Sequence, residues 1–136
     1  MKILLGVGNE LDRKDDSGVY VAKNFKKLGW LVYDCGPVPE NFTGVVAKEK
    51  PELVVVVDNA EMGLKPGEFR IIPKEKLNSL TGGTHNMPLK FLAERLEEDA
   101  ETVIFIGIES NAESRKGEDG VIELLETEII ENFAVL

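Results

Sequence analysis

The stretch that most constrains the fold is the apolar run LVVVV at residues 53–57, which leads directly into Asp58. It is the longest uninterrupted apolar run in the chain, and it is far shorter than the roughly 20 residues of a membrane-spanning helix. A short β-branched run without polar positions is typical of a parallel strand buried on both faces of its sheet. Such a strand needs helices on both faces, so the run indicates an α/β domain.

Further segments supply the other strands and helices. Short apolar segments predict strands at residues 2–7, 30–34, 52–58, 69–72 and 102–108. Helical spacing of apolar residues predicts helices at residues 17–28, 39–50, 87–98 and 122–133, with a helical turn at 73–78. The gap between Asp58 and Phe69 is too short for the crossover helix that a parallel return needs, so the strand at 69–72 should be antiparallel. We therefore expect one domain over residues 1–136, a three-layer α/β sandwich with a five-stranded, mostly parallel sheet and one antiparallel strand.

Apolar stripes define which helix faces should be buried. In the helix predicted at 17–28, the stripe consists of Val21, Phe25 and Leu28, and Gly29 stands in the position favoured for a helix stop. In later helices the stripes are formed by Leu89, Leu92 and Leu96, and then by Ile122, Leu125, Ile129 and Phe133.

Composition and charge exclude several classes of protein. The formal net charge of −9 repels phosphate backbones and anionic lipid heads, so we expect neither nucleic acid binding nor membrane insertion. Cys35 is the single cysteine, which rules out an intramolecular disulfide and a cysteine-rich zinc cluster. The start MKILLGVGNE lacks the features of a signal peptide, and we expect a cytoplasmic monomer.

Three potential ligands are predicted to meet at one edge of the sheet. The loop GNELDRKDDSG follows the first strand, Asp58 ends the third, and His85, the only histidine, precedes the helix at 87–98. In open α/β sheets, ligands bind outside the carboxyl ends of the strands, where these segments converge. A helix N-terminus favours the neutral imidazole that a metal needs, and two carboxylates with one imidazole suit a borderline divalent ion with open coordination positions.

Each of these residues also has a purely structural interpretation. The charged loop could be solvated and capped by Asp16 or Ser17 at the start of the helix. Asp58 could initiate a turn by bonding its own backbone, and His85 could be a polar loop residue. From the residues alone, the metal site and these alternatives remain about equally supported.

Other catalytic motifs are weak or absent. GVGNEL places Leu11 where the third glycine of a dinucleotide fingerprint would stand, so nucleotide binding has little support. Cys35 could be a thiolate nucleophile, but a small buried thiol is the favoured interpretation. The chain has no G-x-S-x-G elbow, H-E-x-x-H helix or P-loop.

Three motifs resemble the hydrogenase maturation endopeptidases, which remove a C-terminal extension from the large subunit of [NiFe] hydrogenases. They are GVGNELDRKDDSG, VVVVDNAEMGLKPGEFRII and THNMPLKFLAERLEED with VIFIGI, in that order between residue 2 and about residue 108. DNAEMGLKPGE and THNMPL are similar to the branch that serves formate hydrogenlyase. The segment ESNAESRKGEDG is shorter and more charged than in many relatives, which indicates the loss of a substrate-contacting or sheet-edge element.

The resemblance implies a ligand set, a substrate and a metal. It places metal ligands at Asp58 and His85. Counting without gaps from Asn9 to Gly18 places the third ligand at Asp15, and a shift of one residue in that alignment would select Asp16 instead. The implied substrate is a nickel-loaded large-subunit precursor that supplies the nickel at least in part, while another divalent ion could occupy the resting protein. A chaperone-like module that binds the loaded subunit without cutting it is the alternative.

Overall fold

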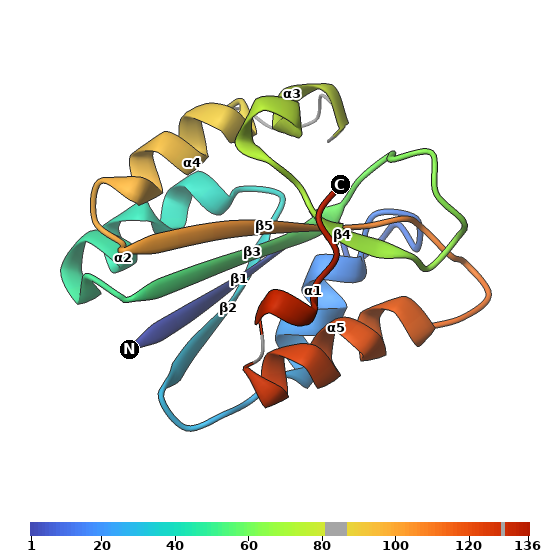
Figure 1. Cartoon of the computed structure of the whole chain (residues 1–136), viewed down its shortest axis with the longest axis horizontal. Helices are drawn as coiled ribbons and strands as arrows, with labels where there is room; N and C mark the ends of the chain where they lie inside the picture. The colour runs from blue at the N-terminus through green and yellow to red at the C-terminus, as the bar shows by residue number, and fades with distance from the viewer. Residues whose placement is uncertain (81–86, 129) are drawn as a thin grey trace.

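The protein's structure is a computed structural model that describes residues 1–80, 87–128 and 130–136 (Figure 1). The strands are β1 (Lys2–Val7), β2 (Trp30–Gly36), β3 (Leu53–Asn59), β4 (Phe69–Ile71) and β5 (Thr102–Ile108). The α-helices are α1 (Ser17–Asn24), α2 (Thr43–Glu49), α3 (Leu77–Leu80), α4 (Leu89–Glu97) and α5 (Lys116–Thr127). Turns of 3₁₀ helix lie at Pro39–Phe42, Lys74–Lys76 and Ile130–Asn132.

The strands form one sheet in the order β2-β1-β3-β5-β4. β1 pairs in parallel with β2 and β3, and β3 pairs in parallel with β5. β4 pairs antiparallel with β5, which confirms the orientation expected from the short connection after β3. The predicted fold class is therefore confirmed, with β3 at the centre of the sheet as its apolar run requires.

Helices cover both faces of this sheet, because alternate residues of each strand point to opposite sides. On one side Ile3, Leu5, Val54 and Val56 pack with residues of α2, α3 and α4. On the other side lie neighbouring strand residues such as Leu4 and Val55, which pack with α1 and α5. Figure 1 shows α2 and α4 above the sheet and α1 and α5 below it.

The helix predicted at residues 17–28 is too long, because α1 ends at Asn24. Phe25 leaves the helical conformation at φ −113° and ψ 128°, and its ring packs edge-on against Trp30 with 5.1 Å between the centroids. Leu28 is therefore fully exposed rather than buried, while Val21 and Phe25 are in the core. Gly29, at φ +90°, turns the chain into β2 rather than ending the helix.

The C-terminal helix also differs from its predicted range of 122–133. α5 begins six residues earlier, at Lys116, and ends at Thr127, after which Glu128 takes a left-handed conformation at φ 57°. The Glu128 carboxylate accepts hydrogen bonds from Lys2 Nζ at 2.8 Å and from Trp30 Nε1 at 2.9 Å, which favours this break. Phe133 follows the final 3₁₀ turn and still reaches the core, whereas Ile129 lies outside the described residues.

α4 is close to its predicted range of 87–98, since it spans Leu89–Glu97. Its predicted stripe of Leu89, Leu92 and Leu96 is buried. Pro88 stands at the N-cap, one residue before the helix rather than in its first turn.

Gly18 allows α1 to lie directly on the carboxyl ends of two strands. A Cβ at this position would stand 2.2 Å from the carbonyl oxygens of both Val7 and Val57. The start of α1 is thus held against β1 and β3 at backbone contact distance, immediately beside Asp58.

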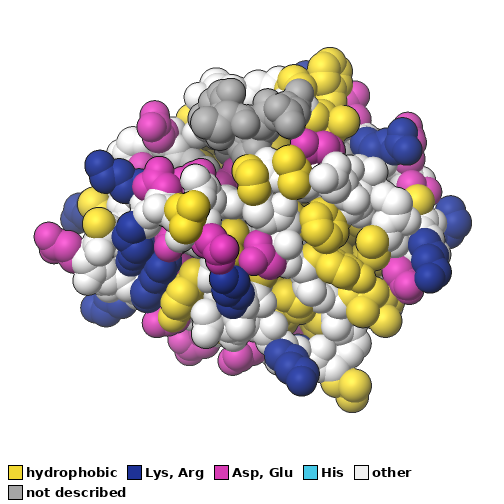
Figure 2. Space-filling model, turned by 180° about the vertical axis from the view of Figure 1, so that it is seen from behind, with side chains coloured by type: hydrophobic (Ala, Val, Ile, Leu, Met, Phe, Trp, Pro, Cys, Tyr) yellow, Lys and Arg dark blue, Asp and Glu magenta, His cyan; other side chains and the backbone are white. Residues whose placement is uncertain are grey.

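The surface carries mixed charges, and on the face in Figure 2 the Lys and Arg side chains are interspersed with Asp and Glu side chains. The exposed large hydrophobic side chains come from separate parts of the chain: Met1, Leu11, Leu28, Phe91 and Val135. None of the helices in the described residues has the length and apolar character that crossing a bilayer requires.

Candidate active site

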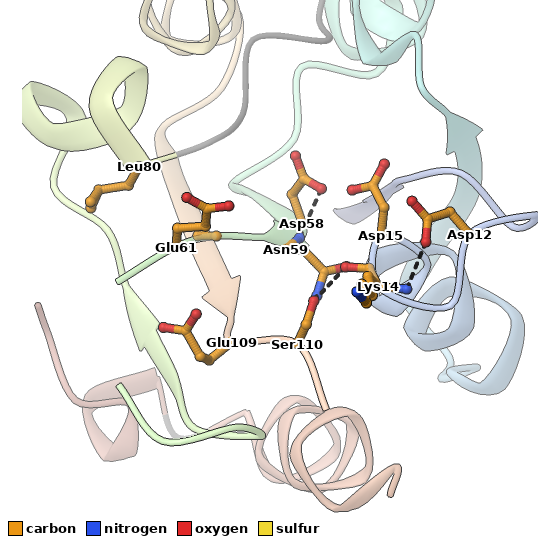
Figure 3. A pocket seen from close by; sticks show the side chains of 10 residues that line it. Asp12, Lys14, Asp15, Asp58, Asn59, Glu61, Leu80, Glu109 and Ser110 are labelled. Atoms are coloured by element: carbon orange, nitrogen blue, oxygen red, sulfur yellow. Dashed lines mark hydrogen bonds between the residues drawn. The ribbon is translucent and has the colours of Figure 1, made fainter. Parts of the chain in front are cut away.

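A pocket of about 390 Å³ lies at the carboxyl edge of the sheet, where the sequence predicts a site (Figure 3). Its lining comes from the loop after β1, the end of β3, the end of α3 and the segment after β5. The residues that line it are Asp12, Lys14, Asp15, Asp58, Asn59, Ala60, Glu61, Leu80, Glu109 and Ser110. Carboxylates therefore dominate its polar groups.

Asp58 is placed by the central strand, β3. The four valines at residues 54–57 are fully buried, and Asp58 itself is only 4% exposed although it lines the pocket. Its Oδ1 accepts a hydrogen bond of 2.8 Å from the Asn59 backbone N–H. Asp58 therefore bonds its neighbouring backbone, as the turn interpretation expects, and also lines the pocket.

Asp15 is placed by a loop of short turns after β1. The Asn9 N–H donates to the Asp15 carbonyl at 2.7 Å, and the Asp15 N–H donates to the Asp12 carbonyl at 2.8 Å. Asp15 lines the same pocket as Asp58, and Figure 3 shows both carboxylates pointing the same way.

Asp16 lies elsewhere, although it is the next residue. Its carboxylate accepts two hydrogen bonds from Arg115, of 2.9 Å and 2.8 Å, and the residue is 9% exposed. Asp16 occupies the N-cap position of α1 but makes no side-chain capping hydrogen bond, because Arg115 binds its carboxylate. The capping interpretation of Asp16 is therefore wrong, and Asp15 is the acid of this pair that lines the pocket.

His85, the third predicted ligand, lies outside the described residues. Within the described part of the chain, no group of three or more His, Cys, Asp and Glu side chains could hold a metal ion. Asp15 and Asp58 supply two carboxylates at one pocket, and carboxylate oxygens with an added imidazole are suitable donors for a first-row divalent ion. The donor chemistry thus fits a metal that takes part of its coordination from elsewhere.

Cys35 is excluded as a nucleophile by its surroundings. It is 3% exposed in the edge strand β2, where burial, followed by the charges of Asp34 and Glu40, raises the thiol pKa to about 12. It lines a second pocket, near Gly8 and Pro37, rather than the one that contains Asp15. The burial of Cys35 confirms the predicted buried thiol.

Sequence reasoning missed several residues that build the site's surroundings. Asn59 and Ser110 were not singled out, yet both line the pocket, and Asn59 Nδ2 donates a hydrogen bond to Ser110 Oγ at 3.2 Å. Arg115 and Glu118 come from the charged segment ESNAESRKGEDG, in which the sequence suggested a lost element. That segment contributes the partner of Asp16, and no local sequence signal identifies it, because Arg115 lies 99 residues away in the chain.

Known proteins are similar to this chain in both sequence and fold. A family model for HycI, described as hydrogenase maturation protease, matches residues 19–127. Hydrogenase 3 maturation protease of Escherichia coli strain K12 is 40% identical over 111 residues, covering 79% of this chain and 71% of that protein. The chain belongs to the hydrogenase maturation protease family.

Solved structures of family members agree with this assignment. The solution structure of the endopeptidase HycI from Escherichia coli has a TM-score of 0.87 at 32% identity, covering 100% of this chain and 96% of the other. The crystal structure of a [NiFe] hydrogenase maturation protease HycI from Thermococcus kodakarensis has a TM-score of 0.74 at 30% identity, covering 96% and 92%. The family predicted from the three sequence motifs is confirmed.

Family membership gives the reaction class. The chain is a hydrogenase maturation endopeptidase, which processes the C-terminus of a hydrogenase large subunit. This assignment disfavours the non-catalytic module and the nucleotide-binding protein that the sequence left as alternatives. The pocket between β1, β3 and β5 is the candidate for its active site.

Proposed function

We propose that this endopeptidase cuts once near the C-terminus of a [NiFe] hydrogenase large-subunit precursor after nickel has been inserted. Asp15, Asp58 and His85 contact the nickel that the substrate carries. The observation that supports this most strongly is the placement of the Asp15 and Asp58 carboxylates in one pocket at the carboxyl edge of the sheet.

The composition of the donor set supports a metal supplied with the substrate. Three protein ligands leave open coordination positions, which ligands from the substrate can complete. When bound, the nickel would polarise the scissile carbonyl or activate a water. The protein's part is to orient its two carboxylates and His85 toward that ion; a divalent ion in the resting protein would use the same three groups.

We also propose that residues 1–136 work as one domain, as a monomer and in the cytoplasm. All five described strands belong to one sheet, which gives the chain a shared core. The exposed large hydrophobic side chains come from separate segments of the chain. Light scattering that shows a dimer would contradict the monomer.

Mass spectrometry of the precursor tests the proposed cleavage. Incubation of nickel-loaded large subunit with the wild-type protein is expected to give a shortened subunit and one free C-terminal peptide. His85→Ala is expected to fold but to release no peptide, because the substrate's nickel loses its imidazole ligand.

A matched control is Asp99→Asn, which removes a carboxylate paired with Lys50 at 3.4 Å before β5, at the opposite edge of the sheet. It should cleave like wild type. A wild-type protein that binds the loaded subunit without releasing a peptide would identify a binding module, and wild-type cleavage by His85→Ala would remove His85 from the site.

A further inference from the structure

Asp15 and Asp58, two of the three aspartates that line the pocket, are each followed in the chain by a residue whose side chain joins a hydrogen-bond network around Arg115 and Glu118. Asp15 lines the pocket and Asp16 binds Arg115. Asp58 likewise points into the pocket, whereas the Asn59 side chain points the opposite way, toward Ser110 (Figure 3). The same network therefore contacts both aspartates through their neighbours in the chain.

Arg115 clamps the first of these neighbours. Its Nη1 and Nη2 donate to the two carboxylate oxygens of Asp16 at 2.9 Å and 2.8 Å, a bidentate geometry that fixes direction as well as distance. Nη1 also donates to Glu118 at 2.8 Å, and the guanidinium lies 4.3 Å from the centroid of the Tyr20 ring. Glu118 is only 1% exposed, so this charge is held in the protein interior.

Asn59 connects the second aspartate to the same cluster through Ser17. The Asn59 Oδ1 accepts from the Ser17 N–H at 3.0 Å, and its Nδ2 donates to Ser17 Oγ at 2.9 Å and to the Ile108 carbonyl at 3.1 Å. Ser17 Oγ then donates to Glu118 at 3.1 Å. Ser110 Oγ, bonded to Asn59, donates to the Lys14 carbonyl, one residue before Asp15.

We propose that Arg115 and Asn59 are positioning residues that hold the carboxylates of Asp15 and Asp58 at a fixed separation for the reaction. Arg115 acts through Asp16, and Asn59 acts through Ser17 and Ser110. This inference rests on the proposed function, because it assumes that the two carboxylates must meet the same group of the substrate.

The placement of buried charge argues for a role beyond stability. Buried ion pairs add little net stability, since apolar side chains of similar volume do as well or better. A geometric role accounts for the burial of these charged side chains, because errors of about 1 Å at a catalytic centre can lower the rate 100-fold. The network adjoins the pocket directly, since Asn59 and Ser110 belong to both, so such errors would arise at the site itself.

Cleavage kinetics on nickel-loaded precursor test the proposal. Arg115→Ala and Asn59→Ala are expected to lower kcat by about 10- to 100-fold. For Arg115→Ala, KM should stay close to the wild-type value, because Arg115 does not line the pocket. Arg115→Lys should have a kcat close to that of Arg115→Ala, because an ammonium group cannot reproduce the bidentate contact with Asp16. The control Lys74→Ala, which removes an exposed ion pair with Glu97, should leave kcat unchanged.

Chemical rescue separates positioning from folding. The Arg115 side chain is 26% exposed, so the space left by Arg115→Ala should admit free guanidinium. Guanidinium, at concentrations far below those that unfold the protein, is expected to restore kcat, whereas methylammonium is not. If Arg115→Ala only destabilises the protein, guanidinium should lower its activity further. A fall in kcat on adding guanidinium would therefore overturn the proposal.

A second variant covers the case in which Arg115→Ala does not fold. Arg115→Met combined with Glu118→Gln removes the cation together with a buried anion, so it avoids an uncompensated charge at Glu118. A folded double variant with wild-type kcat would overturn the proposal. Asp58→Asn shows whether a wild-type kcat in the double variant refutes only the positioning role or the proposed function as well. If Asp58→Asn also cleaves normally, the site assignment itself is wrong.

Discussion

Asp15→Asn is expected to slow cleavage of the nickel-loaded precursor by more than about 100-fold, because even partners of metal ligands typically contribute 10- to 100-fold. An amide is a poorer donor to a cation than a carboxylate, while its size keeps the loop intact. Asp16→Asn should retain measurable cleavage, because its carboxylate binds Arg115 and does not line the pocket. The comparison decides between two adjacent residues that the sequence could not separate.

Single-turnover cleavage followed by mass spectrometry is the suitable measurement, with a thermal melt of each variant. We expect Asp15→Asn to melt near the wild type and Asp16→Asn to melt lower, since it weakens a clamped ion pair. The reverse pattern of activity, with Asp16→Asn inactive and Asp15→Asn active, would show that the register is shifted by one residue.

Gly18→Ala is expected to lower the free energy of unfolding by about 3 kcal/mol, which corresponds to a fall in Tm of roughly 10 °C for a chain of this size. The added methyl would stand 2.2 Å from the carbonyl oxygens of Val7 and Val57, and backbone atoms cannot move aside as a flexible side chain can. The start of α1 must therefore lift away from β1 and β3.

Gly44→Ala is the matched control for this substitution. Gly44 lies in α2, and no neighbouring segment comes within 4 Å of the place that a Cβ would take, so alanine should raise stability by up to about 1 kcal/mol through helix propensity. Calorimetry or a denaturant melt would show the opposite signs. Equal melting temperatures for Gly18→Ala and wild type would contradict the close contact of α1 with the sheet.

The sheet was predictable because its strands carry unambiguous patterns. The apolar run before Asp58 is typical of a central parallel strand, and the short link to Phe69 left no space for a crossover helix. The same topology placed the loop after β1 and the end of β3 at one edge. The positions of Asp15 and Asp58 in one pocket follow from that topology.

Helix ends and charge pairing were not predictable from local pattern. Leu28 continues the spacing of Val21 and Phe25, but the contact between Phe25 and Trp30 ends the helix earlier. The partner of Asp16 is 99 residues away in the chain, so no local spacing reveals it. Long-range packing and ion pairing decided these features.

The most direct test of the central claim compares nickel-loaded with nickel-free precursor under the same conditions. If Asp15, Asp58 and His85 contact nickel carried by the substrate, the wild-type protein should release the C-terminal peptide only from the loaded precursor. Adding nickel to the nickel-free precursor together with its insertion machinery should restore cleavage. Equal cleavage of both precursors would contradict the account.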